Sequence, residues 1–459
     1  MSMINNALSG ALAAQVGLNM TSQNVANMMT PGYTRQGVLL SSVQPLAGGV
    51  LAAGNGVTVS SLLRFSDGYK SVQMWQANSS LGQYSTTQPY LTQLEQVMGD
   101  DTSNLNSGLD AFFSALNAAS VDPSSSPLRQ QVISAADAAA QRFNSINQVL
   151  VNQRQAVFQQ RATTVSLING LSAGIADLNK QIAAAQATGG NTSGLVDARD
   201  LKIDELSKLV GVQVVDQADG TRSVSLRSGQ PLVVGSLAGT LSLEGNLDGS
   251  QTLKLSFAQE SFVVKGDNLS GELGGLNDFE SKVLVPLMES VTEMANQFST
   301  RVNELLADGY TPDGSAGGPL FEFDATSTSS ILKVSDGFLA ADLAFSSDPA
   351  LPGDSGNLLN LIGIQSSQVT LSSIGTVSFS DAATQLVGKL AMDSQQNQTS
   401  MSTAETVRNQ AEESWKSTSG VNEDEEAISL IQFQQMYQAN MKVIAVANEL
   451  FDNTLAAMG

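Results

Sequence analysis

The stretch "EDEEAISLIQFQQMYQANMKVIAVANELFDNTLAAMG", residues 423–459, decides the fold. After its acidic start it carries only three charged side chains, Lys442, Glu449 and Asp452. Apolar side chains recur through it every seven residues, at Leu430, Tyr437, Ile444, Phe451 and Met458, with Phe433, Ala447 and Leu455 beside them. This spacing predicts a helix that packs against other helices. A helix on a solvated surface would carry Lys and Glu on its outer face, so we expect this one to be buried.

The amino-terminal end has the same character. Residues 1–34 contain no charged side chain. The ends of a soluble chain are usually poorly ordered and solvated. The apolar side chains of these two ends instead need to be buried, and a single monomer has little surface to bury them against. We therefore predict an elongated protein whose paired terminal helices form a coiled-coil core in an assembly. The seven-residue repeat at the amino-terminal end is Ile4, Ala11, Leu18 and Val25, with Leu8 and Leu12 on the same side.

The overall charge narrows the choice of partners. The chain has 459 residues, with 22 Lys and Arg against 43 Asp and Glu, which gives a net charge of −21. Such acidity repels phosphate backbones and anionic bilayers, so we expect neither a nucleic-acid partner nor membrane insertion. Residues 1–17 lack a basic start and a compact run of large apolar residues, so we also expect no cleaved signal peptide.

The chain contains neither Cys nor His. This excludes disulfides, thiol nucleophiles and every catalytic arrangement that uses imidazole. We predict no enzyme activity, no catalytic residue, no cofactor and no metal site. The acids at 423–426 point around a helix and do not converge on a cation. They favour a helix start, with Asn422 as the N-cap and Glu425 completing a capping box.

The pattern of apolar residues and breakers divides the chain into segments and predicts a mainly α fold with one inserted antiparallel β-domain. In chain order we expect a core helix at 1–33, an extended or β-hairpin segment at 34–65, the first part of a helical domain at 66–210, the β-domain at 211–270, a returning helix at 271–308, a loop-rich outer segment at 309–380, the last part of the helical domain at 381–420 and the second core helix at 421–459.

Several local signals support this division. Residues 38–43 and 57–63 predict the two strands of the hairpin. Between 212 and 264 apolar and polar residues alternate, with turn signals at 219–220 and 248–249. The sequence therefore predicts short antiparallel strands within an otherwise helical chain.

Residues 195–210 predict an amphipathic helix. Asp204 precedes Lys208 by four residues, the favourable order for an ion pair along one helix face. Gly211 then predicts the carboxyl-terminal cap of this helix.

The first helix is expected to end near Met29, because Pro31 and Gly32 follow it. Tyr33 and Arg35 come next. They predict either a plain turn with a packed aromatic ring or a contact that fixes the direction in which the helix leaves the rest of the molecule.

Three strings resemble known proteins. "SQNVANMMTPGYTRQ" (22–36) is similar to the conserved amino-terminal end of the bacterial flagellar axial proteins. "SGVNEDEEAISLIQFQQMYQANMKVIAVANELFD" (419–452) and "LVDARDLKIDELSKLVGVQV" (195–214) most resemble the flagellar hook-associated protein 1 family. Met28 and Met29 stand where more polar residues are usual in that family, and Glu423 stands where an apolar residue is common.

The resemblance implies a structural subunit at the hook–filament junction, in a tube whose inner core is lined by the terminal helices. It implies export without a cleaved signal to the extracellular flagellum. The implied partners are further copies of the chain, the hook protein, a second hook-associated junction protein and a cytoplasmic export chaperone at the last helix.

These implications assign roles to residues of the two terminal helices. We expect contacts with copies and axial neighbours at Ile4, Leu8, Ala11, Leu18, Val25, Leu430, Phe433, Tyr437, Ile444 and Phe451. We expect the chaperone to bind at Leu430, Ile431, Phe433, Tyr437, Ile444, Leu450 and Phe451.

Three alternatives remain open from the sequence. The first is a hook or distal-rod subunit of the same superfamily. The others belong to different classes: an adhesin carried on the appendage, and a carboxylate-based hydrolase in the acid-rich middle of the chain.

Overall fold

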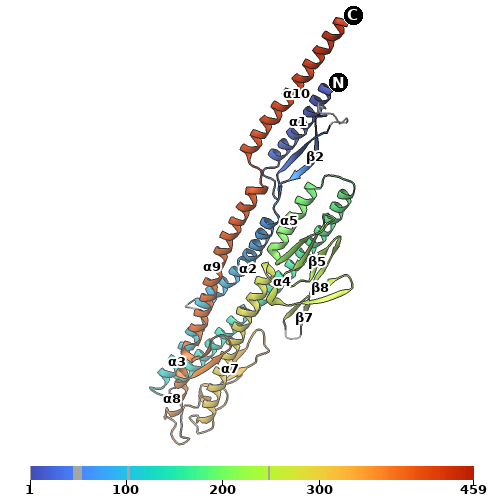
Figure 1. Cartoon of the computed structure of the whole chain (residues 1–459). Coiled ribbons are helices and arrows are strands. Elements are labelled where there is room, and N and C mark those ends of the chain that lie inside the picture. Colours follow the sequence, from blue (N-terminus) through green and yellow to red (C-terminus); the bar gives the residue numbers. More distant parts are fainter. Residues whose placement is uncertain (1, 45–53, 101–103, 247–248, 459) are drawn as a thin grey trace.

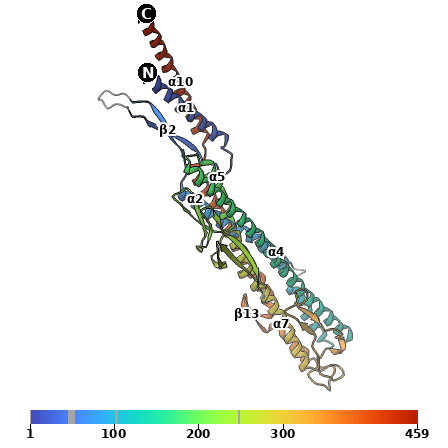
Figure 2. The same cartoon turned by 90° about the vertical axis from the view of Figure 1, so that its right-hand side faces the viewer.

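The computed structural model describes residues 2–44, 54–100, 104–246 and 249–458. It shows a long, narrow molecule with both termini at one end and the loop-rich segment at the other (Figures 1 and 2). Helices dominate and the strands form small antiparallel sheets. This confirms the predicted fold class, a mainly α protein with an antiparallel β insertion.

The two terminal helices pack against each other in opposite directions (Figure 1). They are α1 (Ser2–Ala26) and α10 (Glu423–Met458). Gly10 faces Asn440 and Gly17 faces Phe433, so the contacts recur every seven residues on both helices. Ala447 is the last buried residue of α10, and residues 448–457 are all exposed. This last part of α10 extends past the start of α1 (Figure 1).

The predicted hairpin is present as β1 (Gln36–Ser42) and β2 (Val57–Arg64). The two strands pair from Gln36 opposite Arg64 to Ser42 opposite Val57, with one irregularity at Leu39 and Leu40. The hairpin lies along α1. Its tip, 45–53, lies outside the described residues.

Long helices form the body below the terminal pair. Within the described part of the segment 66–210, predicted as helical, the chain forms four helices. The predicted returning helix at 271–308 is interrupted by a π-helical turn, Glu280–Leu284. The helices of the body are α2 (Gly68–Gly99), α3 (Leu105–Ala119), α4 (Ser126–Ala187), α5 (Ser193–Leu209), α6 (Gly271–Phe279), α7 (Val285–Asp308) and α9 (Phe379–Ser419).

A cluster of aromatic side chains lies at the centre of the core of this body. The ring centroid of Phe298 lies 5.3 Å from that of Phe112, 5.1 Å from that of Phe321 and 5.5 Å from that of Phe379. These residues come from three helices and one short strand and are nearly inaccessible to solvent. Such contacts stabilise the packing beyond the area they bury.

The β insertion consists of two sheets instead of one. The first contains β3 (Val212–Asp216), β4 (Arg222–Leu226), β5 (Pro231–Val234) and β6 (Leu237–Ala238); the second contains β7 (Thr240–Gly245), β8 (Gln251–Phe257) and β9 (Glu260–Val264). Gly220 has a φ of 76°, as the predicted turn requires. In the other predicted turn, Asp248 lies outside the described residues.

The loop-rich segment contains short strands and helical turns. They are β10 (Phe321–Phe323), β11 (Leu332–Val334), α8 (Gly356–Gly363), β12 (Gln368–Leu371) and β13 (Gly375–Ser378). Among the described residues, every helix falls short of the length and apolar character that a bilayer span requires.

Two details predicted for the helix at 195–210 are wrong. Asp204 accepts a hydrogen bond from Asn78 on α2 (2.7 Å), while Lys208 pairs with Glu272 on α6 (3.7 Å). Both side chains therefore contact residues of neighbouring helices instead of each other. The helix ends at an extended Val210, and Gly211 does not adopt the left-handed conformation of a glycine cap.

Candidate functional site

The seam between the terminal helices is built from small residues of α1. They recur with alternating steps of three and four and are all buried: Ala7, Gly10, Ala14, Gly17, Thr21 and Asn24. The sequence-based repeat of larger residues was therefore not the one that packs on α10. Of that repeat, Ala11 is buried, Ile4 and Leu18 are half-buried, and Leu8 and Val25 are exposed.

On α10, the predicted repeat does form the seam, but within the same chain. The ring of Phe433 lies so close to Gly17 that a Cβ there would be 2.5 Å from it. By the same spacing Leu430, Tyr437 and Ile444 face α1; Leu430, Phe433 and Ile444 are half-buried, and Tyr437 is at the edge of exposure. These four residues were expected to contact partners. Within the single chain they pack on α1, because the small side chains of α1 leave room for large ones on α10, and their contacts with partners stay a prediction.

Large apolar side chains remain partly exposed on the sides of both helices that face away from the seam, and on α10 where it extends beyond the start of α1. We call them the outer apolar faces. Leu12 of α1 is 54% exposed, and Phe451 of α10 is 63% exposed. The faces comprise Leu8, Leu12 and Val25 on α1, and Ile428, Ile431, Val443, Val446, Leu450, Phe451 and Leu455 on α10. Apolar surface of this extent marks an interaction site.

Replacing Gly17 by Ala should loosen the terminal pair. The new methyl group would lie 2.5 Å from the Phe433 ring, so one helix must shift, at a cost of about 1–3 kcal/mol. Hydrogen exchange of residues 2–26 is expected to accelerate. The matched control is Gly170→Ala in α4, where a Cβ meets nothing within 4 Å and the change should stabilise the helix by about 0.5–1 kcal/mol. Unchanged exchange in Gly17→Ala would show that the seam is not close-packed.

A network of buried polar groups joins the terminal pair to the rest of the chain; we call this region, residues 24–36 with 419–426, the neck. Glu426 is 2% exposed. Its Oε1 accepts a hydrogen bond from Arg35 Nε (2.8 Å) and its Oε2 accepts one from Asn24 Nδ2 (3.1 Å). Asn24 also donates to the carbonyl of Gln36 (2.8 Å) and accepts from the backbone N–H of Gln36 (3.1 Å). The neck thus fixes the end of α1, the start of β1 and the start of α10 together.

Tyr33 completes the neck. Its hydroxyl donates to Asn24 Oδ1 (2.8 Å). Burial, followed by the charges of Asp197 and Glu426, raises the pKa of Tyr33 to about 12, so the hydroxyl keeps its proton. These contacts support the second interpretation of Tyr33 and Arg35, in which they fix the direction of the first helix.

Two features were predicted for the start of α10, an N-cap at Asn422 and a capping box with Glu425, and only the first is present. Asn422 Oδ1 accepts hydrogen bonds from the backbone N–H groups of Asp424 (3.0 Å) and Glu425 (3.3 Å), which confirms Asn422 as the N-cap. The side chain of Glu425 pairs with Arg35 instead of closing a capping box. Across the described residues, no group of three or more acids is placed to hold a metal ion.

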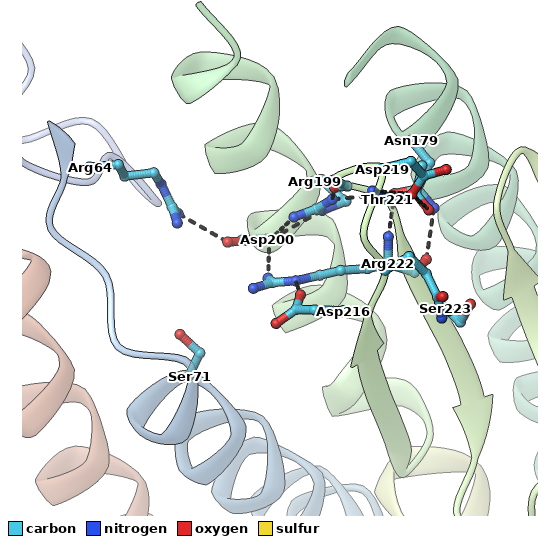
Figure 3. Close-up of polar contacts among 12 residues, drawn as sticks. Arg64, Ser71, Asn179, Arg199, Asp200, Asp216, Asp219, Thr221, Arg222 and Ser223 are labelled. Carbon is cyan, nitrogen blue, oxygen red and sulfur yellow. Dashed lines mark hydrogen bonds and ion pairs between the residues drawn. The ribbon is translucent and has the colours of Figure 1, made fainter. Parts of the chain in front are cut away.

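A second set of charges links the hairpin to the β insertion (Figure 3). Arg64 at the end of β2 pairs with Asp197 (2.7 Å) and Asp200 (3.0 Å) of α5. Asp200 also pairs with Arg222 of β4 (2.5 Å), which pairs in turn with Asp216 of β3 (2.5 Å). The direction of the hairpin is therefore coupled to both α5 and the first sheet.

Beside the neck lies a cavity of about 460 Å³. Its walls come from the turn between α1 and β1, from the end of β2, from α2, α5 and α9, and from residues 420–421. Its lining is mixed. The apolar members include Met29, Met74, Trp75, Trp415 and Leu201, and the charged members are Arg64, Asp200, Asp204, Arg408, Glu412 and Lys416. We call it the neck pocket.

Asp204 lines the neck pocket and is largely buried. Burial raises the pKa of Asp204 to about 6, although the nearby Arg408 and the hydrogen bond from Asn78 oppose this effect. In the unfolded chain the pKa of an aspartate is about 3.9. Burying Asp204 favours its protonated form. The stability that this protonated carboxyl contributes to the fold is therefore fully present below about pH 4 and is lost as the pH rises through 6.

The variant Asp204→Asn cannot ionise and keeps an amide oxygen for Asn78. Relative to the natural chain, its free energy of unfolding should rise by about 2–3 kcal/mol between pH 4 and pH 8. Chemical denaturation of both proteins at several pH values measures this difference. Parallel pH profiles would show that Asp204 does not carry the effect.

Comparisons with known proteins bear directly on this arrangement. Residues 91–321 match the family model described as flagellar hook-associated protein FlgK helical domain. The chain belongs to the flagellar hook-associated protein 1 family. Flagellar hook-associated protein 1 of Bacillus subtilis is 30% identical over 492 residues, covering 97% of this chain and 96% of the relative.

Other relatives agree with this membership. Flagellar hook-associated protein 1 of Salmonella typhimurium is 28% identical, with 99% of both chains covered. Residues 417–457 match the model of the carboxyl-terminal region of the flagellar basal body rod proteins FlgEFG. The solved structure of the flagellar hook junction protein FlgK from Burkholderia pseudomallei matches with a TM-score of 0.52 and 31% identity, over 55% of this chain and 47% of that chain.

Sequence reasoning missed the small-residue seam and the roles of Asn24 and Glu426 in the neck. The sequence does contain the pattern of the seam, as two further seven-residue repeats in the first helix. One is Ala7, Ala14 and Thr21, and the other is Gly10, Gly17 and Asn24. The larger residues at Ile4, Leu18 and Val25 have the same period, and their greater hydrophobicity favoured the wrong side of the helix.

Proposed function

We propose that the chain is a structural subunit of the bacterial flagellum that acts as an adaptor at the hook–filament junction and assembles through its terminal helices. The observation that carries this proposal is the pair of outer apolar faces, held at one end of a long molecule by the polar contacts of the neck. Burying one large apolar side chain contributes about 1.5–3 kcal/mol. Repeated over many copies, such contacts stabilise a closed ring or a helical array.

The partners follow from this role. They are further copies of the chain, the hook protein and a second hook-associated junction protein, all outside the cell, after export without a cleaved signal. The core helices at 1–33 and 421–459 would face the inside of the tube, and the segments between them would face outward. Leu8, Val25, Tyr437 and Phe451 are the exposed members of the predicted contact set.

A cytoplasmic chaperone would use α10 before export. Ile431, Leu450 and Phe451 are exposed and available to it. Leu430, Phe433, Tyr437 and Ile444 lie on the α1 side of α10, so a chaperone that binds them must compete with α1. We therefore propose that the chaperone holds a form of the chain in which the terminal pair is open.

Family membership favours the adaptor over the three alternatives, because the matching relatives are named as hook-associated proteins and not as hook subunits, adhesins or hydrolases. The test is a strain that lacks the chain. It should keep its hooks and release filament protein into the medium. Normal filaments on such cells would refute the proposed function.

A further inference from the structure

The β1–β2 hairpin is attached to the terminal pair at a place far from its base. Asn6 Nδ2 of α1 donates to the carbonyl of Gly54 (3.0 Å). Ser9 Oγ of α1 accepts from the backbone N–H of Val57, at the start of β2 (3.1 Å). Between these contacts Gly56 has a φ of 92°, and a Cβ there would overlap Ser9 Oγ. The backbone of the hairpin therefore lies directly on α1.

The base of the same hairpin is attached to the body. Arg64, the last residue of β2, pairs with Asp197 (2.7 Å) and Asp200 (3.0 Å) of α5. Asp200 pairs in turn with Arg222 of the first sheet (2.5 Å; Figure 3). The side chains of Arg64, Asp197 and Asp200 are each at most 16% exposed, so solvent and salt screen these pairs weakly.

The two attachments lie on opposite sides of the neck and at different distances from it. The neck holds α1 near Asn24, whereas the upper attachment of the hairpin holds it at Ser9. The separation is about 15 helical residues, or roughly 22 Å. With the base of the hairpin fixed, a tilt of about 10° at the neck would displace Ser9 by about 4 Å, more than a hydrogen bond tolerates. The upper attachment therefore opposes tilting far more effectively than contacts at the neck.

We propose that the β1–β2 hairpin is a strap that sets the tilt of the terminal pair relative to the body, attached to α1 at Ser9 and to α5 through Arg64. This inference concerns the single chain and does not depend on the proposed function. Through Arg222 and Asp200 the strap also connects the first sheet to the terminal pair. A displacement of that sheet would thus change the direction of the core helices.

Distances between two spin labels test the lower attachment, because the chain contains no cysteine of its own. The labels are placed at Leu12→Cys on α1 and Leu167→Cys on α4, which are 54% and 52% exposed. Pulsed electron–electron double resonance of the dilute monomer should give one narrow distance distribution. Arg64→Gln should widen it about twofold, since the pair then tilts on a lever of roughly 22 Å. The matched control Glu244→Gln, which removes an ion pair with Lys254 in the second sheet, should leave it narrow.

A variant of the upper attachment gives the second test. Gly56→Ala should widen the same distribution, because the new methyl group meets Ser9. Its control is Gly54→Ala, where a Cβ meets nothing closer than the carbonyl oxygen of Val43 at 3.6 Å. A strap released at one end no longer transmits force, so Arg64→Gln with Gly56→Ala should be no wider than either single variant.

Three outcomes would overturn the proposal. The first is a distribution of natural width in either single variant. The second is a width that keeps growing when both ends are released, since independent contacts would add. The third is equal broadening between labels at Leu167→Cys and Leu359→Cys, both in the body, because this would show a general loss of structure instead of a released strap.

Discussion

Replacing Leu12 by Asp is expected to abolish filament attachment while the body of the protein unfolds at an unchanged temperature. Leu12 is 54% exposed on α1 and belongs to the outer apolar faces. In the assembly this position would lose about 1.5–3 kcal/mol of apolar burial, and a buried unpaired carboxylate adds several kcal/mol more. A loss of about 4 kcal/mol per contact corresponds to roughly a thousandfold in affinity.

The measurement combines counts of filaments per cell with thermal unfolding of the purified monomer. The control is Leu167→Asp in α4, which puts the same charge on a leucine of nearly equal exposure, 52%, outside the terminal pair. Leu167→Asp cells should retain their filaments. Filaments on Leu12→Asp cells, or a monomer that unfolds early, would contradict the assigned role of α1.

Replacing Glu426 by Ala is expected to release the terminal pair from its fixed direction. The change leaves Arg35 and Asn24 without their buried acceptor, and removing one partner of a buried ion pair costs about 3–5 kcal/mol. Hydrogen exchange should accelerate at 24–36 and 419–426, with little change in α4 and α7. Cells with this variant should lose motility.

Glu425→Ala provides the matched control, because Glu425 pairs with the same guanidinium group but its side chain is 56% exposed. An exposed ion pair contributes up to about 1 kcal/mol, so this variant should exchange almost as the natural chain does. If the two variants behaved alike, burial of Glu426 would not be what holds the neck.

The sequence predicted those features that depend on neighbouring residues. Asn422 caps α10 because a cap needs only the backbone N–H groups two and three residues ahead. The hairpin, the helix breaks and the alternation of the strands are likewise local. The scarcity of charge at both ends also indicated correctly that both terminal helices carry extensive apolar surface.

Features that depend on distant segments could not be predicted in this way. The partner of Asp204 is Asn78, which is 126 residues away, and the predicted partner Lys208 turns to another helix. The choice of Gly17 as the position that faces Phe433 depends on the register between the two chain ends. The neck brings Arg35 to Glu426 across 391 residues.

The central claim is that the outer apolar faces lie in water in the monomer and are covered in the flagellum. Labelling of Leu12→Cys with a maleimide tests it, because no other thiol is present. We predict rapid labelling of the purified monomer, protection in intact flagella and renewed labelling after their dissociation. Equally rapid labelling in intact flagella, or protection in the dilute monomer, would contradict the account.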